Sequence, residues 1–411
     1  MTQVFAGPVR DVDIDIESEN GDVFDNCRSA VADLAEALEQ AGVFPYFRAL
    51  EGPAGPRAVV DGRPVIMLGS NNYLGLADDP RVRAAGHAAL DRFGSGCTGS
   101  RLLNGTTVLH REMEEYLADW LGTEACLVIT TGYGANLAAI SGTVGPADRT
   151  LVDAAAHASM LDGRTLSRSQ LGRFRHNDVA SLTRRLRTPH PTGGTLVAVD
   201  GLYSMEGDFA RLEEFAAACR GKARLLVDEA HSLGVAGSSG AGAAESAGVR
   251  PDIITGTFSK SLASCGGFIA AAADVIRHIR VAARPFLFTA SGVPAALGAG
   301  LQAAKIARTE DWRRDQLASN GQRLRNGLSQ LGFSVGGHAD SPIVPVHIGN
   351  DAAAIHLWSE LFDRGVYVNC AIAPAVPARG ALLRASVIAT HTDQDIDDAL
   401  SAFADITPMN R

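Results

Sequence analysis

Lysine is scarce in this 411-residue sequence, which contains three lysines among 37 basic residues. Positive charge as a whole is limited, because the formal net charge is −9 at pH 7. This balance disfavours a protein that wraps a nucleic acid, since that function needs a basic surface. The sequence also lacks a phosphate-binding G-x-x-x-x-G-K-[ST] loop, because its one Gly-Lys pair, Gly221–Lys222, is followed by alanine. An ATPase of the helicase type is therefore disfavoured.

Closely spaced cysteines are also missing. The six cysteines are scattered over positions 27, 97, 126, 219, 265 and 370, and none forms a C-x-x-C pair. This pattern is typical of reduced thiols in a cytoplasmic enzyme and does not indicate a metal site or a disulfide framework. Residues 1–22 are acidic and lack the basic start and apolar stretch of a signal peptide, which agrees with a cytoplasmic location.

Two uncharged runs, residues 125–147 and 285–304, are long enough to cross a bilayer. Glycine, threonine, serine, asparagine or proline interrupts both runs, so their hydrophobicity is too diluted for a membrane span. We expect buried strand–turn–helix segments instead.

Short apolar strands alternate with helical patterns from about residue 80 to residue 300. The strand patterns are residues 125–130, 149–153, 194–200, 223–228 and 252–258. This alternation predicts an α/β fold with a mainly parallel sheet that helices cover on both faces.

The flanking segments predict further elements. A helical pattern over residues 27–42 and a strand hairpin from residue 58 precede the alternating region. One long helix from about residue 303 to residue 332 follows it and opens a smaller α+β region. We therefore expect three parts: an N-terminal arm and helix (1–60), a large cofactor-binding domain (61–304) and a small C-terminal domain (305–411).

Ligands of open α/β sheets bind beyond the carboxyl ends of the strands. Polar residues that directly follow the apolar strands are therefore the first candidates for a site. They fall in five groups: Thr131–Tyr133, Asp153–His157, Asp200–Ser204, Asp228–His231 and Thr257–Lys260.

The stretch LLVDEAHSLGV, residues 225–235, is compatible with two kinds of chemistry. Asp-Glu-Ala-His after an apolar strand is a magnesium-holding motif of one class of helicases. An aspartate at the end of a strand can also hold the pyridine nitrogen of pyridoxal phosphate (PLP). The missing phosphate-binding loop favours the PLP interpretation.

PLP needs a lysine, and Lys260 is the best of the three. Lys222 lies in a polar turn and Lys305 in a long amphipathic helix, where both are expected to face solvent. Lys260 follows a strand within TGTFSKSLASCGG, among hydroxyls and small residues. A desolvated lysine at such a position loses its proton easily and can form a Schiff base.

The other strand ends meet the remaining needs of PLP. The turn TTGYGANLAAI offers a helix N-terminus for the phosphate, and Thr257 and Ser259 add hydroxyls. Asp228 can keep the pyridine nitrogen protonated, so that the ring acts as an electron sink. His231 can reach the phenolic oxygen of the ring, and His157 can stack on it.

Beyond these strand ends, the sequence resembles the α-oxoamine synthase family of fold-type I PLP enzymes, whose large domain is like that of aspartate aminotransferase. The matching stretches follow one another from about residue 40 to residue 400, and include IMLGSNNYLGL, FGSGCTGSRLLNGTTVLHREMEEYLADWLG, TTGYGANL, DAAAHASMLDG, FRHND, GLYSMEGD, LLVDEAHSLGV, GTFSKSLASCGGF, RPFLFTAS and LLRASVIATHT. Within the family, GSGCTGSRLLNGT and RPFLFTAS most resemble the bacterial serine palmitoyltransferase group. The resemblance implies a homodimer with shared active sites.

The resemblance also implies roles for individual residues. Cofactor contacts are implied at Gly132, Tyr133, His157, Ser204, Asp228, His231, Thr257, Ser259, Lys260 and Thr289, the last from the partner subunit. Lys260, His157, Asp228 and His231 would be the catalytic residues. Asn72, Ser100 and Arg384 would bind the substrate, and Arg384 suits its carboxylate because arginine binds carboxylates in a bidentate manner.

The implied reaction is the decarboxylative condensation of an amino acid, with serine favoured, and an acyl thioester, which gives an α-amino ketone. The amine could instead be alanine or glycine, and the donor could be acyl-CoA, an acyl carrier protein or a pimeloyl thioester, as in 8-amino-7-oxononanoate synthase. A PLP aminotransferase remains a further alternative.

Overall fold

The computed structural model describes residues 24, 27, 29–188, 193–373 and 375–406, and the chain divides into two compact units between Tyr46 and Phe47. In the first unit, helix α1 (Ala30–Gln40) begins at Ser29, whose side chain caps the backbone N–H of Ala32. This confirms the predicted N-terminal helix. All further description concerns the second unit.

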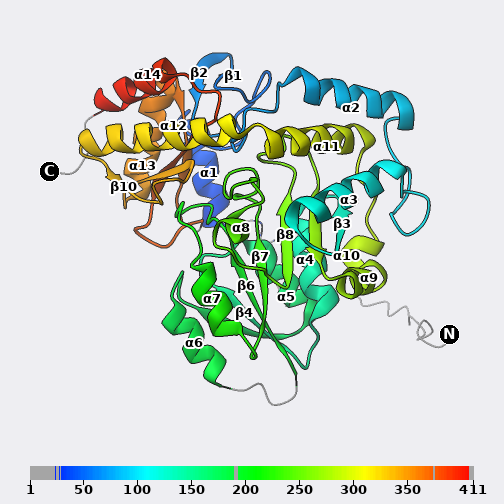
Figure 1. The fold of residues 1–411 in the computed structure, drawn as a ribbon. Coiled ribbons are helices and arrows are strands. Elements are labelled where there is room, and N and C mark those ends of the chain that lie inside the picture. The colour runs from blue at the N-terminus through cyan, green and yellow to red at the C-terminus, as the bar shows by residue number, and fades with distance from the viewer. Residues whose placement is uncertain (1–23, 25–26, 28, 189–192, 374, 407–411) are drawn as a thin grey trace, which may run out of the picture. The chain divides into compact units, whose positions relative to one another are not determined.

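A seven-stranded sheet forms the centre of the second unit (Figure 1). Its strands are β3 (Ala125–Ile129), β4 (Arg149–Asp153), β5 (Gln170–Phe174), β6 (Thr195–Asp200), β7 (Arg224–Asp228), β8 (Ile253–Thr257) and β9 (Gly267–Ala271). They lie in the order β3-β9-β8-β7-β6-β4-β5, and β9 is antiparallel to both of its neighbours. The pairs from β8 to β5 are parallel, which confirms the predicted sheet.

Helices cover both faces of this sheet. They are α2 (Pro80–Phe93), α3 (Val108–Leu121), α4 (Gly132–Thr143), α5 (Ala158–Ser167), α6 (Val179–Arg187), α7 (Leu212–Cys219), α8 (Ala243–Ser246), α9 (Ala273–Ala282), α10 (Arg284–Leu287) and α11 (Pro294–Thr309). Strand β6 is buried along its whole length, and its residues alternate between two cores. Leu196 and Ala198 pack on the side of α4, whereas Val197 and Val199 pack on the side of α6 and α7.

The C-terminal part adds helices to two smaller sheets. One sheet consists of strands β1 (Arg57–Val60), β2 (Arg63–Met67) and β12 (Val366–Tyr367). The other consists of strands β10 (Ser334–Val335), β11 (Ile343–His347), β14 (Leu382–Ser386) and β13 (Asn369–Ala371), in this order. Helices α12 (Asp311–Gln330), α13 (Asp351–Asp363) and α14 (Asp393–Ala404) complete this part. The α+β pattern predicted after residue 305 is confirmed, while the three-part domain division stays a prediction.

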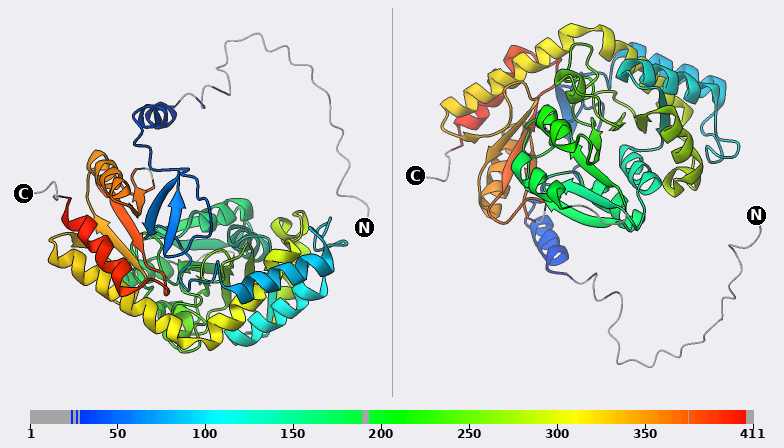
Figure 2. Two further views of the ribbon diagram at one scale, coloured as in Figure 1. Left: turned by 90° about the horizontal axis from the view of Figure 1, so that it is seen from above. Right: turned by 60° about the horizontal axis from the view of Figure 1, so that its bottom comes forward.

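The helix expected over residues 303–332 is in fact two helices. Helix α11 ends at Thr309, and α12 begins at Asp311. Glu310 between them leaves the helical conformation and forms ion pairs with Arg81 and Arg313. Helix α11 packs against α2, whereas α12 packs against α14 (Figure 2). The prediction of one continuous helix was therefore wrong.

Within the described ranges, no helix combines the length and the hydrophobicity that a membrane span requires.

Candidate active site

A cavity of about 330 Å³ lies at the carboxyl ends of the central parallel strands. Nine residues predicted from the sequence line it: Gly132, Tyr133, His157, Ser204, Asp228, His231, Thr257, Ser259 and Lys260. They follow β3, β4, β6, β7 and β8, so the topology of the sheet brings them together from distant parts of the chain.

Lys260 lies in the turn after β8 and is partly buried. Desolvation lowers the pKa of its amine from 10.5 to about 8, against the opposing effect of the nearby Asp228 and Asp200 carboxyl groups. Lys260 is part of the cavity lining, so its amine is accessible to a molecule bound there.

Asp228 at the end of β7 is fixed on both of its oxygens. Its Oδ2 accepts a hydrogen bond from Asn136 Nδ2 at 2.6 Å, and its Oδ1 accepts one from the backbone N–H of Ala230 at 2.9 Å. Asn136 is oriented in turn by Thr255, whose hydroxyl donates to Asn136 Oδ1 at 2.7 Å. Sequence reasoning missed Asn136, although it lies one helical turn after the predicted phosphate loop.

The N-terminus of α4 and the turn after β8 form a polar cradle. Thr131 caps α4 by accepting from the backbone N–H of Gly134, and Gly132 is the first helical residue. A Cβ atom at Gly132 would lie 2.7 Å from Thr257 Cβ, so only glycine fits this close approach. The hydroxyls of Thr257 and Ser259 lie 2.8 Å apart beside it. Such a cradle suits a phosphate group.

His157 caps the N-terminus of α5 and is exposed beside the cavity. Its Nδ1 lies 2.7 Å from the hydroxyl of Ser159, and desolvation lowers the pKa of the ring. Its backbone N–H donates to Asp200 Oδ2 at 3.1 Å. Asp200 also lines the cavity, and desolvation followed by repulsion from Asp228 raises the pKa of its carboxyl group well above the usual range. Sequence reasoning assigned no role to Asp200.

A chain of hydrogen bonds leads from the cavity to the second sheet. His231 Nδ1 lies 2.7 Å from the hydroxyl of the fully buried Tyr73. Arg384, in β14, donates to the Tyr73 oxygen and to Asn71 Oδ1, both at 3.1 Å. Arg384 can only donate, so the Tyr73 hydrogen goes either to His231 Nδ1 at 2.7 Å or to Asn71 Oδ1 at 3.2 Å. The shorter contact favours His231 as the acceptor, an arrangement that places the His231 proton on Nε2.

Arg384 is buried and approaches the cavity from the side of Ser204. Its Nε donates to the backbone carbonyl of Ser204 at 2.5 Å. Its positive charge is close enough to contribute to lowering the pKa of Lys260 and of His231, although desolvation is the larger cause for both. The predicted carboxylate-binding arginine therefore lies beside the cavity, although it is not part of the lining.

The structure does not bring the side chains of three other predicted residues to the cavity. Asn72 Oδ1 accepts from the backbone N–H groups of Leu76 and Ala77, and its amide donates to the carbonyl of Ala54. Ser100 lies in the loop before α3, and Thr289 follows α10. The neighbouring Asn71, which the sequence did not single out, contacts Arg384 instead.

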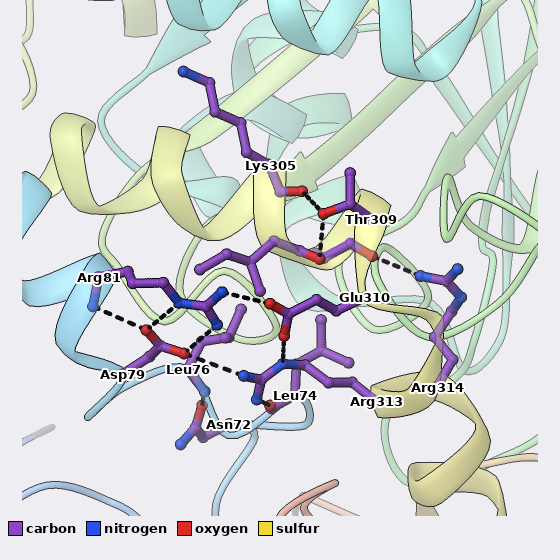
Figure 3. A network of polar contacts seen from close by, with 12 residues as sticks. Asn72, Leu74, Leu76, Asp79, Arg81, Lys305, Thr309, Glu310, Arg313 and Arg314 are labelled. Atoms are coloured by element: carbon purple, nitrogen blue, oxygen red, sulfur yellow. Dashed lines mark hydrogen bonds and ion pairs between the residues drawn. The ribbon is translucent and has the colours of Figure 1, made fainter.

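A charge network centred on the buried pair Arg313 and Asp79 holds the loop that carries Tyr73 (Figure 3). Arg313 donates to the backbone carbonyl of Leu74 at 2.7 Å and pairs with Asp79 at 3.1 Å. Arg81 links the same Asp79 to Glu310, at the break between α11 and α12. The position of Tyr73 thus depends on residues far away in the sequence.

These residues fit pyridoxal phosphate. The cavity offers a reactive lysine, a fixed carboxylate for the pyridine nitrogen, a histidine N–H for the phenolic oxygen and a glycine-lined cradle for the phosphate. His157 supplies a ring that could stack on the cofactor.

Comparisons with known proteins agree with this arrangement. The sequence matches the aminotransferase class I and II family over residues 63–403. A serine palmitoyltransferase of Caulobacter vibrioides is 44% identical over 384 residues, covering 92% of this chain and 94% of the relative. An 8-amino-7-oxononanoate synthase of Geotalea daltonii is 40% identical over 378 residues, covering 90% of this chain and 96% of the relative.

A solved structure shares the whole architecture. The serine palmitoyltransferase of S. paucimobilis, a lysine-to-alanine variant with a bound PLP–myriocin aldimine, superposes with a TM-score of 0.90 at 39% identity. The superposition covers 93% of this chain and 98% of the other. The predicted fold-type I architecture is thereby confirmed.

Proposed function

This chain belongs to the α-oxoamine synthase family of aminotransferase class I and II proteins, and we propose that it condenses serine with an acyl thioester. It is a PLP-dependent acyltransferase, as its relatives are. Overall, the amino acid and the thioester give an α-amino ketone, carbon dioxide and a free thiol. The convergence of Lys260, Asp228, His231 and Arg384 at one cavity is the observation that carries this proposal.

Bound PLP supplies an electron sink for negative charge at the amino-acid Cα. Asp228 would hold the pyridine nitrogen, and the Nε2–H of His231 would donate to the phenolic oxygen. Gly132, Thr257 and Ser259 would bind the phosphate, and His157 would stack on the ring. Asn136 keeps the Asp228 carboxylate in place through its 2.6 Å hydrogen bond.

Lys260 acts as the base. Its pKa of about 8 makes the neutral amine available near neutral pH, and it takes the proton from the amino-acid Cα. A bond then forms between Cα and the thioester carbonyl carbon, and the bond from that carbon to sulfur breaks. The leaving thiolate takes a proton from solvent and becomes the free thiol. The carboxyl group is lost as carbon dioxide, and the proton held by Lys260 returns to Cα.

Arg384 and Asn71 would hold the amino-acid carboxylate. Arg384 is fixed by the Ser204 carbonyl and by Tyr73, so that a bound carboxylate is held in one orientation. Fixing the carboxylate also fixes the direction of the Cα–H bond relative to Lys260. This alignment would restrict proton removal to productive complexes.

We also propose a homodimer, to which Thr289 would contribute from the partner subunit. Leu103 and Phe288 are 78% and 75% exposed, which is unusual for large apolar side chains. They belong to two loops that are joined by hydrogen bonds from Ser291 to the carbonyls of Gly99 and Gly105. A second subunit on these loops would bury the apolar side chains and bring Ser100 and Thr289 to its own cavity.

We place the reaction in the cytoplasm, because all six cysteines are free thiols, as is usual in a reducing compartment.

The test is the coupled release of thiol and carbon dioxide. Purified protein loaded with PLP is incubated with palmitoyl-CoA and carboxyl-labelled serine, alanine or glycine in turn. We expect one labelled carbon dioxide for each thiol released, fastest with serine, and no release by Lys260→Ala. Conversion of the amino acid to its keto acid without carbon dioxide would identify an aminotransferase and contradict the proposal.

A second candidate function is the condensation of alanine with a pimeloyl thioester. The 40% identity to an 8-amino-7-oxononanoate synthase favours it almost as strongly as the serine palmitoyltransferase relatives favour the first candidate. The same assay with pimeloyl-CoA separates the two, because a preference for alanine and the short acyl chain would assign the second.

A further inference from the structure

A charged cluster that the proposed mechanism does not use lies at the carboxyl ends of β4 and β5. Asp153 ends β4, and His176 follows β5. His176 Nδ1 lies 3.0 Å from Asp153 Oδ1, and its Nε2 lies 3.2 Å from both carboxylate oxygens of Asp208. Ionised carboxylates only accept hydrogen bonds, so this arrangement suits a ring with a proton on each nitrogen. Burial opposes the charge, but the hydrogen bonds to Asp153 and Asp208 raise the pKa of His176 to about 10.

Asn177 adds hydrogen bonds from its backbone and from its side chain. Its backbone N–H donates to Asp153 Oδ2, and its Nδ2 donates to Asp208 Oδ2 and to the carbonyl of Phe209, all at 2.8 Å. Its Oδ1 accepts from the backbone N–H of Arg211 at 3.0 Å. The φ of Asn177 is +49°, in the left-handed region that asparagine tolerates better than most residues. One asparagine in this unusual conformation thus ties the turn after β5 to the segment beyond β6.

The segment that the cluster holds is a closed loop, residues 203–209. Tyr203 donates from its backbone N–H to the carbonyl of Asp208, and the N–H of Gly207 donates to the carbonyl of Tyr203, both at 3.0 Å. The rings of His176 and Tyr203 meet in a T-shaped arrangement, with centroids 4.4 Å apart. His176 therefore contacts the loop at Tyr203 and at Asp208, near its two ends.

The same loop reaches the cavity. Ser204 is part of the cavity lining, and its carbonyl accepts from Arg384 Nε at 2.5 Å. Met205 packs against a small apolar cluster that includes Leu382 of β14, the strand that carries Arg384. The loop therefore contacts both the charged cluster and the strand of the predicted carboxylate-binding arginine.

The cluster is better suited to position the loop than to stabilise the fold. Ion pairs add little to stability, because the loss of hydration offsets much of their attraction. The side chains of His176 and Asp208 are 28% and 32% exposed, so this pair does not seal the core either. Hydrogen-bonded networks of this kind do provide a defined geometry, because each donor and acceptor tolerates few orientations.

We propose that His176 and Asn177 are positioning residues for the amino-acid carboxylate. Through Asp208 they hold the loop, so that the Ser204 carbonyl keeps the Arg384 guanidinium in one orientation. This inference rests on the proposed function and adds to it two residues that are not part of the cavity lining. A loop that shifts by about 1 Å would turn the guanidinium away from the bound carboxylate, and a displacement of this size can cost roughly 100-fold in rate.

The test is a selective loss of amino-acid affinity in His176→Gln, which removes the positive charge and leaves one donor group where the ring has two. Visible absorption of the PLP-loaded protein, titrated with L-serine, reports amino-acid binding. We expect the Kd of serine to rise roughly tenfold or more. The Kd of PLP should change much less, because Lys260, Asp228 and Thr257 lie on or after β7 and β8. The control, His356→Gln, alters an exposed histidine of α13 and should leave both constants unchanged.

Hydrogen exchange of the protein without PLP tests the loop directly. In His176→Gln, the segment with Tyr203 and Gly207 should exchange faster, because their N–H groups bond within the loop, whereas the central sheet should keep the rates of the parent. Asp208→Asn, which keeps the shape of the side chain, should raise the serine Kd similarly. The double variant should raise it no further than either single variant does, because both changes break one contact.

Several outcomes would overturn the proposal. A serine Kd like that of the parent, or multiplied effects in the double variant, would mean that His176 does not act on Arg384 through Asp208. Parallel losses of serine and PLP affinity, with faster exchange throughout the chain, would mean that the cluster serves the fold alone. If His176→Gln does not fold, Asp208→Asn decides. If the parent spectrum responds to none of serine, alanine and glycine, the proposed function fails, and local exchange still shows whether the cluster holds the loop.

Discussion

Removing the Tyr73 hydroxyl should impair the reaction although Tyr73 does not line the cavity. Tyr73→Phe keeps the fully buried ring and deletes the oxygen that joins His231 to Arg384. Burial raises the pKa of the hydroxyl, so it stays protonated at neutral pH and can donate to His231. In the variant, His231 Nδ1 loses its donor, and Arg384 keeps the Ser204 carbonyl and Asn71 as acceptors.

The expected cost follows from these contacts. The neutral hydrogen bond to His231 contributes about 1 kcal/mol, and the one from the charged Arg384 about 1.5 kcal/mol, at the lower end of the range because Arg384 keeps other partners. A loss of about 2.5 kcal/mol in the transition state corresponds to a fall of roughly 70-fold in kcat/KM for the amino acid. Since PLP and the carboxylate are both affected, we expect kcat to fall and KM to rise.

Two measurements separate this positioning role from a structural one. Nitrogen NMR of the protein without PLP should show His231 protonated on Nε2 in the parent and a mixture of tautomers in Tyr73→Phe. The pH dependence of the visible absorption of bound PLP should shift in the variant. Tyr116→Phe, which alters a half-buried tyrosine of α3, should leave both signals unchanged. An unaltered His231 spectrum with kcat/KM within twofold of the parent would refute the reasoning.

Three further predictions concern charge. The rate at which the protein without PLP captures the cofactor should rise about tenfold per pH unit up to pH 8 and then level off, because the pKa of Lys260 is about 8; stopped-flow absorption that still climbs near pH 9.5 would contradict this. Arg384→Lys should raise the amino-acid KM by roughly 10- to 100-fold, since an ammonium cannot bind a carboxylate in a bidentate manner, and initial rates showing an unchanged KM would exclude Arg384 from carboxylate binding. Arg313→Leu should lower the free energy of unfolding by about 3 kcal/mol in urea titrations, because the carboxylates of Asp79 and Glu310 lose a buried partner, whereas an unchanged midpoint would mean that Arg81 compensates alone.

The residues that the sequence predicted best all follow strands of the parallel sheet. Apolar strands that alternate with helices fix both the direction of each strand and the edge at which it ends, so Asp228 and Lys260 had to lie near each other. Their chemistry could then be predicted from residue type alone. The position of Arg384 was less constrained, because it depends on how β14 of another sheet approaches this edge.

Asn71 and Asn72 show where prediction from the sequence reached its limit. Both are asparagines in one short loop, and residue type cannot tell which side chain turns toward Arg384. Backbone groups decide it, because the N–H groups of Leu76 and Ala77 need an acceptor and Asn72 Oδ1 supplies one. This leaves Asn71 free for the arginine.

The break at Glu310 had a signal in the sequence, since acidic residues are typical of the first turn of a helix. Asp311 lies in the first turn of α12, directly after Glu310. The amphipathic pattern continues through this point and hides the break. Tertiary contacts end α11, because Glu310 forms ion pairs with Arg81 from α2 and with Arg313.

The pKa of Asp200 depends on residues that only the folded chain brings to the same cavity. The sequence places its carboxyl group at a strand end, as it does for Asp228, yet the two acids differ in what they can do. Burial and the neighbouring Asp228 raise the pKa of the Asp200 carboxyl group well above its ordinary range, which disfavours a second negative charge at this edge of the cavity. Its Oδ2 meanwhile accepts the backbone N–H of His157, which fixes the ring that would stack on PLP. One acid can therefore serve the cofactor by its charge and the other by its position, a difference that arises from the packing around each strand end.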